Sequence, residues 1–284
     1  MPDQTFTFAS NTDGLTITAY RWDAANPRAV VVISHGAAEH ALRYERFARV
    51  LNGAGYAVWA PDHRAHGKSP GPEGLGDFGA GGWDALVADI HQLVALAKQA
   101  HPGLPVVLFG HSMGAAAAQQ FAPEGSRDIA ALVLSGSTAR DVPKPGEQPP
   151  PFAPNAPFEP ARTQYDWLSR DEAEVDKYVA DPLCGFEMVR LRGNRADPFR
   201  LADPEVLKQI RSDLPVLFVA GDADPINRNL EGLNLLEERW KDAGVQSIDK
   251  LYYPGGRHEM LNETNRDQVM ADIVAWLNDH ARLR

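Results

Sequence analysis

The chain alternates short apolar runs with longer amphipathic stretches, and this alternation restricts the folds open to it. Runs this short and this apolar are typical of strands that are buried on both faces. Between them, apolar residues recur every three or four positions, most clearly over residues 83–97, as in amphipathic helices. The pattern predicts right-handed crossovers and a mostly parallel sheet with helices on both faces. The runs lie at residues 29–33, 56–59, 106–109, 131–134, 216–219 and 251–253.

The N-terminal segment has a different pattern. Residues 5–8 and 15–20 alternate polar and apolar side chains, and a polar turn over residues 11–14 separates them. This predicts an antiparallel hairpin with one face in water, which brings the α/β sheet to about eight strands. No period of about 20 to 50 residues repeats along the chain, which disfavours solenoids and propellers.

A proline-rich stretch interrupts the alternation. Eight prolines fall within residues 143–160, and such a segment cannot form a helix interior or a central strand. After it, residues 165–178 and 204–210 have short helical patterns without strands between them. We interpret residues 137–213 as a cap inserted over the carboxyl edge of the sheet, where open α/β folds bind ligands, and residues 1–136 and 214–284 as the core.

Composition narrows the partners. The 284 residues carry a net charge of −10, which disfavours binding to nucleic acid. A single cysteine excludes an internal disulfide framework and a cysteine-based zinc site. The N-terminus lacks the pattern of a signal peptide, and no apolar run approaches the roughly 20 residues of a membrane span. We expect a cytoplasmic monomer or homodimer, without stable membrane insertion and with no metal or other cofactor.

Ser112 lies in a G-x-S-x-G motif between a buried strand and a helix-forming run, the context of a nucleophile elbow. The turn must be so tight that side chains at Gly110 and Gly114 would collide, and it holds the serine hydroxyl clear of the backbone. The helix N-terminus behind the serine supplies unpaired N–H groups for a developing oxyanion. The motif therefore predicts a nucleophilic serine.

A serine nucleophile needs a histidine base and a carboxylate, here in the chain order Ser, Asp, His. Asp222 and Asp224 both follow the strand at residues 216–219, and we predict Asp224 as the acid, with Asp222 as the rival or as a turn residue. His258 follows the next strand on a glycine-rich loop and is the predicted base. His280 is expected at a solvated helix end.

The loop after the strand at residues 29–33 is expected to supply the second half of an oxyanion hole. The residue after His35-Gly36 on this loop is Ala37, and its backbone N–H is expected to form the pair with that of Met113. Both roles belong to the backbone, so the size of these side chains matters more than their chemistry. A larger residue at position 37 would crowd the acyl pocket.

Other reactive side chains have simpler explanations. Asp62, His63 and His66 lie close in sequence, yet they lack a second acidic ligand and favour a loop braced by hydrogen bonds over a metal site. His111 is expected to be a satisfied structural histidine at a strand end. Cys184, without a basic neighbour, is expected to be packed and unreactive.

Together these residues resemble the α/β-hydrolase superfamily, and within it the monoacylglycerol lipase and bacterial lysophospholipase group, often labelled serine aminopeptidase-like. The resemblance implies a triad of Ser112, Asp224 and His258, an oxyanion hole at Ala37 and Met113, and hydrolysis of a carboxylic monoester through an acyl-enzyme. The sequence departs from the family at Ala38, where many members have glycine. The motifs that carry the resemblance are His35-Gly36 with Glu39-His40 and Arg43-Tyr44, Asp62-His63 with His66-Gly67 and Ser69, residues 110–114 and 221–225, and Arg257-His258-Glu259.

The expected reaction is hydrolysis of short to medium acyl monoesters, monoacylglycerols or lysophospholipids among them, with Phe186 and Ile226 in an apolar acyl pocket. An amidase or aminopeptidase is the alternative, and its amine would need a carboxylate such as Glu187, Asp197 or Asp203. A ligand-binding protein without catalysis is the remaining alternative. Dehalogenases and epoxide hydrolases of this fold are excluded, because they need an aspartate nucleophile at the position of the serine.

Overall fold

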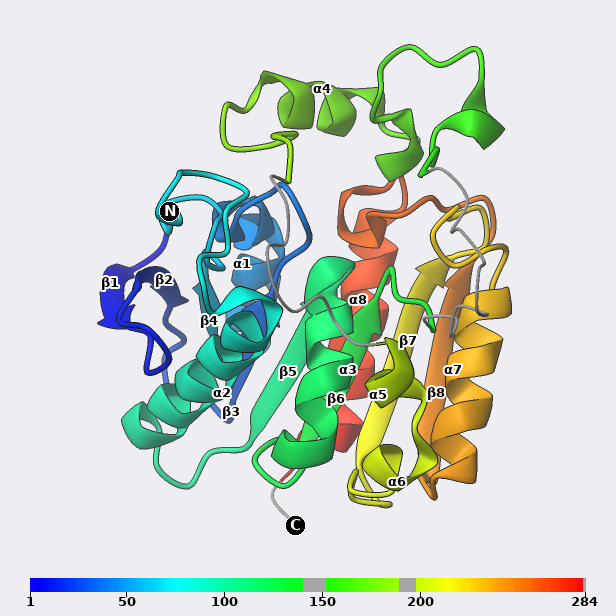
Figure 1. Cartoon of the computed structure of the whole chain (residues 1–284). Helices are drawn as coiled ribbons and strands as arrows, with labels where there is room; N and C mark the ends of the chain where they lie inside the picture. Colours follow the sequence, from blue (N-terminus) through cyan, green and yellow to red (C-terminus); the bar gives the residue numbers. More distant parts are fainter. Residues whose placement is uncertain (140–151, 189–197, 283–284) are drawn as a thin grey trace.

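The computed structural model describes residues 1–139, 152–188 and 198–282, and these build one eight-stranded sheet (Figure 1). The order across the sheet is β1-β2-β4-β3-β5-β6-β7-β8. β2 pairs antiparallel with β1 and β4, and the pairs from β4 to β8 are parallel, which confirms the predicted α/β architecture. The strands are β1 (Gln4–Ala9), β2 (Thr16–Trp22), β3 (Ala29–Ser34), β4 (Tyr56–Pro61), β5 (Val106–His111), β6 (Ala131–Ser135), β7 (Pro215–Gly221) and β8 (Ser247–Tyr253).

Helices cover both faces of the sheet (Figure 1). α1 (Glu45–Gly53) and α8 (Arg266–His280) pack on one face, where their apolar side chains join those of the strands in one cluster. α2 (Gly82–Ala100), α3 (Met113–Gly125) and α7 (Glu231–Asp242) pack on the other face in a second cluster. The central strands are therefore apolar at successive positions, since both of their faces are buried.

At both edges of the sheet, the burial of the strands differs from the prediction. Of the predicted hairpin, β1 has the expected exposed positions, but β2 is mostly buried because it lies between β1 and β4. β8 is the opposite edge strand, and its apolar run at residues 251–253 is only partly buried. Full burial on both faces was the wrong expectation for this strand, since an edge strand has a neighbour on one side only.

The segment after β6 lies partly outside the described residues, including positions 140–151 of the proline-rich stretch. From residue 152 it forms two short 3₁₀ turns, η2 (Ala156–Phe158) and η3 (Asp166–Leu168), followed by α4 (Glu172–Ala180), above the carboxyl ends of the strands (Figure 1). The helical pattern at 165–178 is split, because Ser169 is extended and the Asp171 side chain caps α4.

The rest of the expected insertion takes a different position. α5 (Pro198–Ala202) and α6 (Pro204–Leu207) lie beside α3 and α7, along the face of the sheet (Figure 1). Leu201, Leu207 and Ile210 are buried in the same apolar cluster as those helices. The limits of the cap at residues 137 and 213 stay a prediction, and this packing favours a cap that ends before residue 198. Within the described residues, no helix is long and apolar enough to cross a membrane.

Candidate active site

Ser112 occupies the turn between β5 and α3, with φ of 52° and ψ of −113°. This left-handed conformation is costly for a residue with a side chain and is held here by the surrounding strands. The Ser112 N–H donates to the carbonyl of Ser135 on β6 at 2.9 Å. A side chain at Gly114 would collide with the carbonyl of Ser34, so the close approach of α3 to β3 requires glycine there.

His258 and Asp224 form a buried hydrogen-bonded pair. His258 Nδ1 lies 2.9 Å from Asp224 Oδ2, and the other carboxylate oxygen of Asp224 accepts from the N–H of Ile226 at 2.8 Å. Burial lowers the pKa of His258, but the attraction of the Asp224 carboxylate outweighs it and raises the pKa above its ordinary value. His258 Nε2 is buried and has no protein partner, so this nitrogen is available to exchange a proton.

The two alternative candidates, Asp222 and His280, make their contacts outside the site. The Asp222 side chain accepts from the N–H of Gly255 at 2.7 Å and is exposed, so it has the role of a turn residue. His280 lies at the end of α8 and stacks on Trp276, with Nδ1 2.8 Å from the Trp276 carbonyl oxygen. Of the two predicted acids, Asp224 is therefore the one that contacts His258.

Backbone N–H groups border the site at two places. Ala37 lies on the loop after β3, and Met113 is the first residue of α3, so its N–H is among those without an intrahelical acceptor. The N–H of Gly36 donates to Glu39 Oε1 at 2.5 Å and is not free for a ligand. Both predicted oxyanion-hole residues thus line the same cavity as Ser112.

A buried ion network connects this loop to the histidine loop. Arg43, in the 3₁₀ turn η1 (Ala41–Tyr44), contacts Glu39 at 2.6 Å and binds both oxygens of Glu259 at 2.7 Å. Glu259 directly follows His258, so one guanidinium orients the loops of both the base and the oxyanion donor. Sequence reasoning quoted these three residues only as family motifs and missed their connection; the i,i+4 spacing of Glu39 and Arg43 was the available signal.

A cavity of about 570 Å³, open to solvent, joins the site to the cap. Ser112 and His258 line it, and so do Phe186 and Ile226, the two residues predicted for the acyl pocket. The ring of Trp167 lies 4.8 Å from that of His258, and the Trp167 carbonyl accepts from the His258 N–H at 3.4 Å. Sequence reasoning did not assign six further aromatic residues to the wall of this cavity, which are Phe78, Trp83, Phe152, Tyr165, Trp167 and Tyr178.

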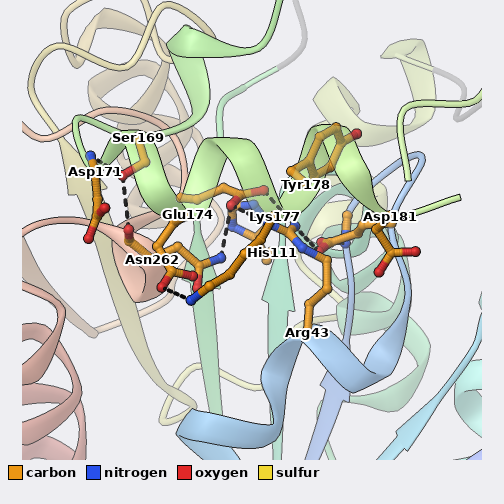
Figure 2. Close-up of polar contacts among 12 residues, drawn as sticks. Arg43, His111, Ser169, Asp171, Glu174, Lys177, Tyr178, Asp181 and Asn262 are labelled. Atoms are coloured by element: carbon orange, nitrogen blue, oxygen red, sulfur yellow. Dashed lines mark hydrogen bonds and ion pairs between the residues drawn. The ribbon is translucent and has the colours of Figure 1, made fainter. Parts of the chain in front are cut away.

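Hydrogen bonds connect the cap to the core. The Ala38 carbonyl, on a residue with φ of 52°, accepts from the hydroxyl of Tyr178 at 2.8 Å and from the N–H of Gly185 at 2.9 Å. Figure 2 shows Ser169 facing Asn262 across this boundary, with the Ser169 hydroxyl donating to the Asn262 carbonyl at 2.9 Å. The cap therefore contacts the oxyanion loop on one side and the histidine loop on the other.

Ion pairs add to these contacts around α4. Arg46 contacts Glu174 at 2.7 Å, and Arg266 contacts Asp171 at 2.6 Å (Figure 2 shows both acids on the cap). Asp181 lies 2.9 Å from His40 on the oxyanion loop. With Cys184, these last two residues bring three potential metal ligands together, the one such group among the described residues.

The remaining candidates are structural. Asp62 accepts from the N–H groups of Ala41 and Lys68, as expected of a braced loop. Burial lowers the pKa of His111 to about 4 and raises that of Cys184 well above the ordinary range of a thiol, so both are neutral.

The acids considered for amine recognition do not line the cavity where they can be located. Glu187 is exposed, and Asp203 caps α6. Asp197 lies outside the described residues. The carboxylates that do line the cavity, Glu39 and Glu259, are both paired with Arg43.

A strained serine after β5, an acid after β7 and a histidine after β8, on a mostly parallel sheet, define the protein as an α/β-hydrolase. The chain belongs to the family described as serine aminopeptidase, S33, which matches residues 25–265. It is 32% identical over 270 residues to the monoacylglycerol lipase of Mycolicibacterium smegmatis, with 90% of each chain covered. It is 34% identical over 299 residues to human monoglyceride lipase, covering 98% of this chain and 92% of the relative.

Solved structures agree. A thermostable carboxyl esterase from Bacillus coagulans superposes with a TM-score of 0.88 at 26% identity, over 99% of this chain and 100% of the other. The monoacylglycerol lipase of Paleococcus ferrophilus gives a TM-score of 0.71 at 27% identity, over 92% of this chain and 99% of the other. The protein is a carboxylic ester hydrolase of the monoacylglycerol lipase and esterase type.

Proposed function

We propose that the protein hydrolyses monoacylglycerols and similar short to medium acyl monoesters, including lysophospholipids, with Ser112 as nucleophile, His258 as base and Asp224 as acid. One observation carries the proposal: Ser112 and the hydrogen-bonded pair of His258 and Asp224 border one cavity with aromatic walls. The names of the relatives support monoacylglycerols as the substrate class.

The reaction proceeds through an acyl-enzyme. Ser112 Oγ attacks the ester carbonyl carbon, and its proton passes to His258 Nε2 while Asp224 holds the imidazole and stays ionised. The N–H groups of Ala37 and Met113 stabilise the negative oxygen of the tetrahedral intermediate. The intermediate collapses, the C–O bond to the alcohol breaks, and His258 gives the proton to the leaving oxygen. Water then repeats the sequence on the acyl-enzyme and releases the acid and free Ser112.

As a substrate, an ester is favoured over a peptide that would bind by its amino terminus. A bound ammonium group would need an unpaired carboxylate in the cavity. Among the described residues, the carboxylates that line it, Glu39 and Glu259, are both already paired with Arg43, and each also accepts a hydrogen bond from another side chain. The apolar wall provides burial for an acyl chain instead.

In this proposal the cap is the described segment 152–188, and it provides one wall of the cavity. Phe186 lies on it and packs edge-on against His66 at 5.2 Å, so the cap reaches the core at the acyl side. Ile226 provides an apolar side chain from the core, beside the acid loop.

The test is the initial rate on p-nitrophenyl esters from acetate to palmitate and on the matching 1-monoacylglycerols, with Ser112→Ala as the blank. We expect ester turnover that falls by about four to six powers of ten in the variant, because the triad acts as a unit. Serine-independent turnover would overturn the nucleophile assignment. Absence of turnover on every ester, with turnover on aminoacyl p-nitroanilides, would overturn the ester preference.

A further inference from the structure

The indole of Trp167, on the cap, covers the imidazole of His258. The centres of the two rings are 4.8 Å apart, and their planes meet at 36°. Rings that lay side by side could not approach so closely, and the angle excludes a perpendicular contact, so the rings meet face against face. The His258 side chain is 1% exposed, and the contact is therefore shielded from water.

Backbone hydrogen bonds fix the position of this indole. The His258 N–H donates to the Trp167 carbonyl at 3.4 Å, and the N–H of the next residue, Glu259, donates to the carbonyl of Leu168 at 2.8 Å. Two successive residues of the histidine loop are thus bonded to two successive residues of the cap. The indole is placed by the backbone of both segments, and the position of the cap sets the surroundings of the imidazole.

The surroundings of His258 matter because its charge changes during the proposed reaction. The imidazole is neutral when it accepts the proton of Ser112, and the imidazolium is present in the tetrahedral intermediate. The face of an indole attracts a cation, most strongly where water is excluded. A contact that favours only the charged form stabilises the transition state over the ground state, and it therefore accelerates the reaction.

The titratable groups that act on His258 do not oppose this charge. Asp224 contacts Nδ1 at 2.9 Å, and the carboxylates of Glu39 and Glu259 also attract the imidazolium. The ring of His111 lies 4.9 Å away, but burial lowers the pKa of His111 to about 4, so this neighbour is neutral and does not repel the charge. The contact with Trp167 therefore adds to an environment that already favours the imidazolium.

We propose that the ring face of Trp167 stabilises the imidazolium form of His258, so that the cap contributes to the chemical step as well as to the cavity wall. The proposal rests on the proposed ester hydrolysis by Ser112 and His258. Trp167 acts through the base and is a positioning residue. A protein whose cap is displaced keeps its triad and loses this contribution.

The experiment weakens the attraction of the indole for a cation and leaves its packing in place. All six tryptophans are replaced by mono-, di- or trifluorotryptophan, because fluorine withdraws electron density from the ring face. We expect kcat on p-nitrophenyl acetate to fall with each fluorine, by about tenfold in total. The acid limb of kcat/KM is expected to move to lower pH, since a fluorinated ring favours the imidazolium less and lowers the pKa of His258.

Two variants show whether Trp167 causes the dependence on fluorine. Trp167→Leu keeps an apolar cover and Trp167→Phe keeps an aromatic ring that fluorotryptophan does not label, so kcat is expected to be independent of fluorine in both. Trp276→Leu is the matched control, because Trp276 stacks on His280 at 4.4 Å on α8, away from the cavity. Its kcat and its dependence on fluorine are expected to equal those of wild type.

Three outcomes bear on the proposal differently from the expected one. A wild-type kcat that does not depend on fluorine overturns it, and so does an equal dependence in the Trp167 variants. If Trp167→Leu loses activity on p-nitrophenyl octanoate and hydrolyses the acetate at the wild-type rate, Trp167 is a wall for the acyl chain only, and the proposal is overturned. Absence of Ser112-dependent ester turnover in the unlabelled protein would instead overturn the function on which it rests.

Discussion

The core and the cap are held together by different forces. Two apolar clusters fill the space between the sheet and its helices, and the strands β3 to β7 are buried throughout. The cap segment buries few apolar side chains, chiefly Leu168, Val175 and Tyr178, and contacts the core through ion pairs and backbone hydrogen bonds. The comparison shows that hydrophobic packing holds the strands that carry the site, whereas polar contacts hold the cap segment above it.

The largest expected effect is a loss of kcat at the site in the core, and two neighbouring aspartates test it. Asp224→Asn is expected to lower kcat by about 10⁴, because an amide holds the His258 imidazole in the wrong tautomer. Asp222→Asn is the matched control two residues away on the same loop, and it is expected to change kcat little, since the Asp222 side chain accepts from the Gly255 N–H and does not contact His258. Initial rates on one ester check both. If Asp222→Asn gives the greater loss, the roles of the two acids are exchanged.

The next effect concerns the ion network where the core meets the cap. Arg43→Met leaves the carboxylates of Glu39 and Glu259 buried without a cation, and this is expected to destabilise the protein by about 3–5 kcal/mol. Urea unfolding measures the loss. Adding Glu39→Gln and Glu259→Gln to Arg43→Met removes the stranded charges, so the triple variant is expected to recover part of the stability. A triple variant less stable than Arg43→Met would contradict the electrostatic explanation.

Low pH is expected to affect the stability of the core and of the cap differently. Burial lowers the pKa values of His66 and His111 in the core to about 4, so between pH 6.5 and 4 the unfolded chain binds more protons than the folded one. Stability is therefore lost as the pH falls through this range, by up to about 3 kcal/mol for each histidine. In the cap, Arg266 lowers the pKa of Asp171, so that carboxylate stays ionised until more acidic pH.

Thermal unfolding from pH 8 to 4.5 checks this expectation. His111→Gln cannot take up the proton, and its unfolding temperature is expected to depend less steeply on pH than that of wild type. Equal slopes for the two proteins would show that the buried histidine does not cause the acid sensitivity.

The smallest effect is expected in the cap. Arg266→Met removes the partly exposed pair with Asp171 and is expected to cost less than about 1 kcal/mol of global stability. Its effect is expected to be local: α4 amides exchange hydrogen faster, while those of β5 and β6 keep the wild-type rate. Lys208→Met, which removes an exposed pair with Glu205 on α6, is the control and leaves α4 unchanged. Faster exchange throughout the sheet would mean that cap and core are one cooperative unit.

The same contrast explains what the sequence could predict. Strands buried on both faces consist of apolar residues at successive positions, so the apolar runs located β3 to β7, and a shorter apolar run located the partly buried edge strand β8. The elbow was also predictable, because the glycines beside Ser112 meet a local steric requirement. The acid and base followed from the order of motifs along the strands.

The cap was harder to predict because its contacts join residues far apart in the chain. Nothing near Ala38 in sequence indicates that its carbonyl accepts from Tyr178 and Gly185. Trp167 likewise reaches His258 only because the chain returns over the carboxyl edge of the sheet. The periodicity at residues 204–210 correctly indicated a short helix, but periodicity does not determine which surface a helix covers, and α6 lies beside the sheet.

The hydrogen bonds at the Ala38 carbonyl have a consequence for how the protein is made. The oxyanion loop is synthesised early, yet the groups that hold its strained backbone belong to Tyr178 and Gly185, and the histidine loop follows later still. On the ribosome, an N-terminal portion of the chain can form β-strands before it has these partners. The site therefore gains its final geometry in one late step, and a nascent chain without residues 178–258 is expected to be inert toward esters however well its first strands have folded.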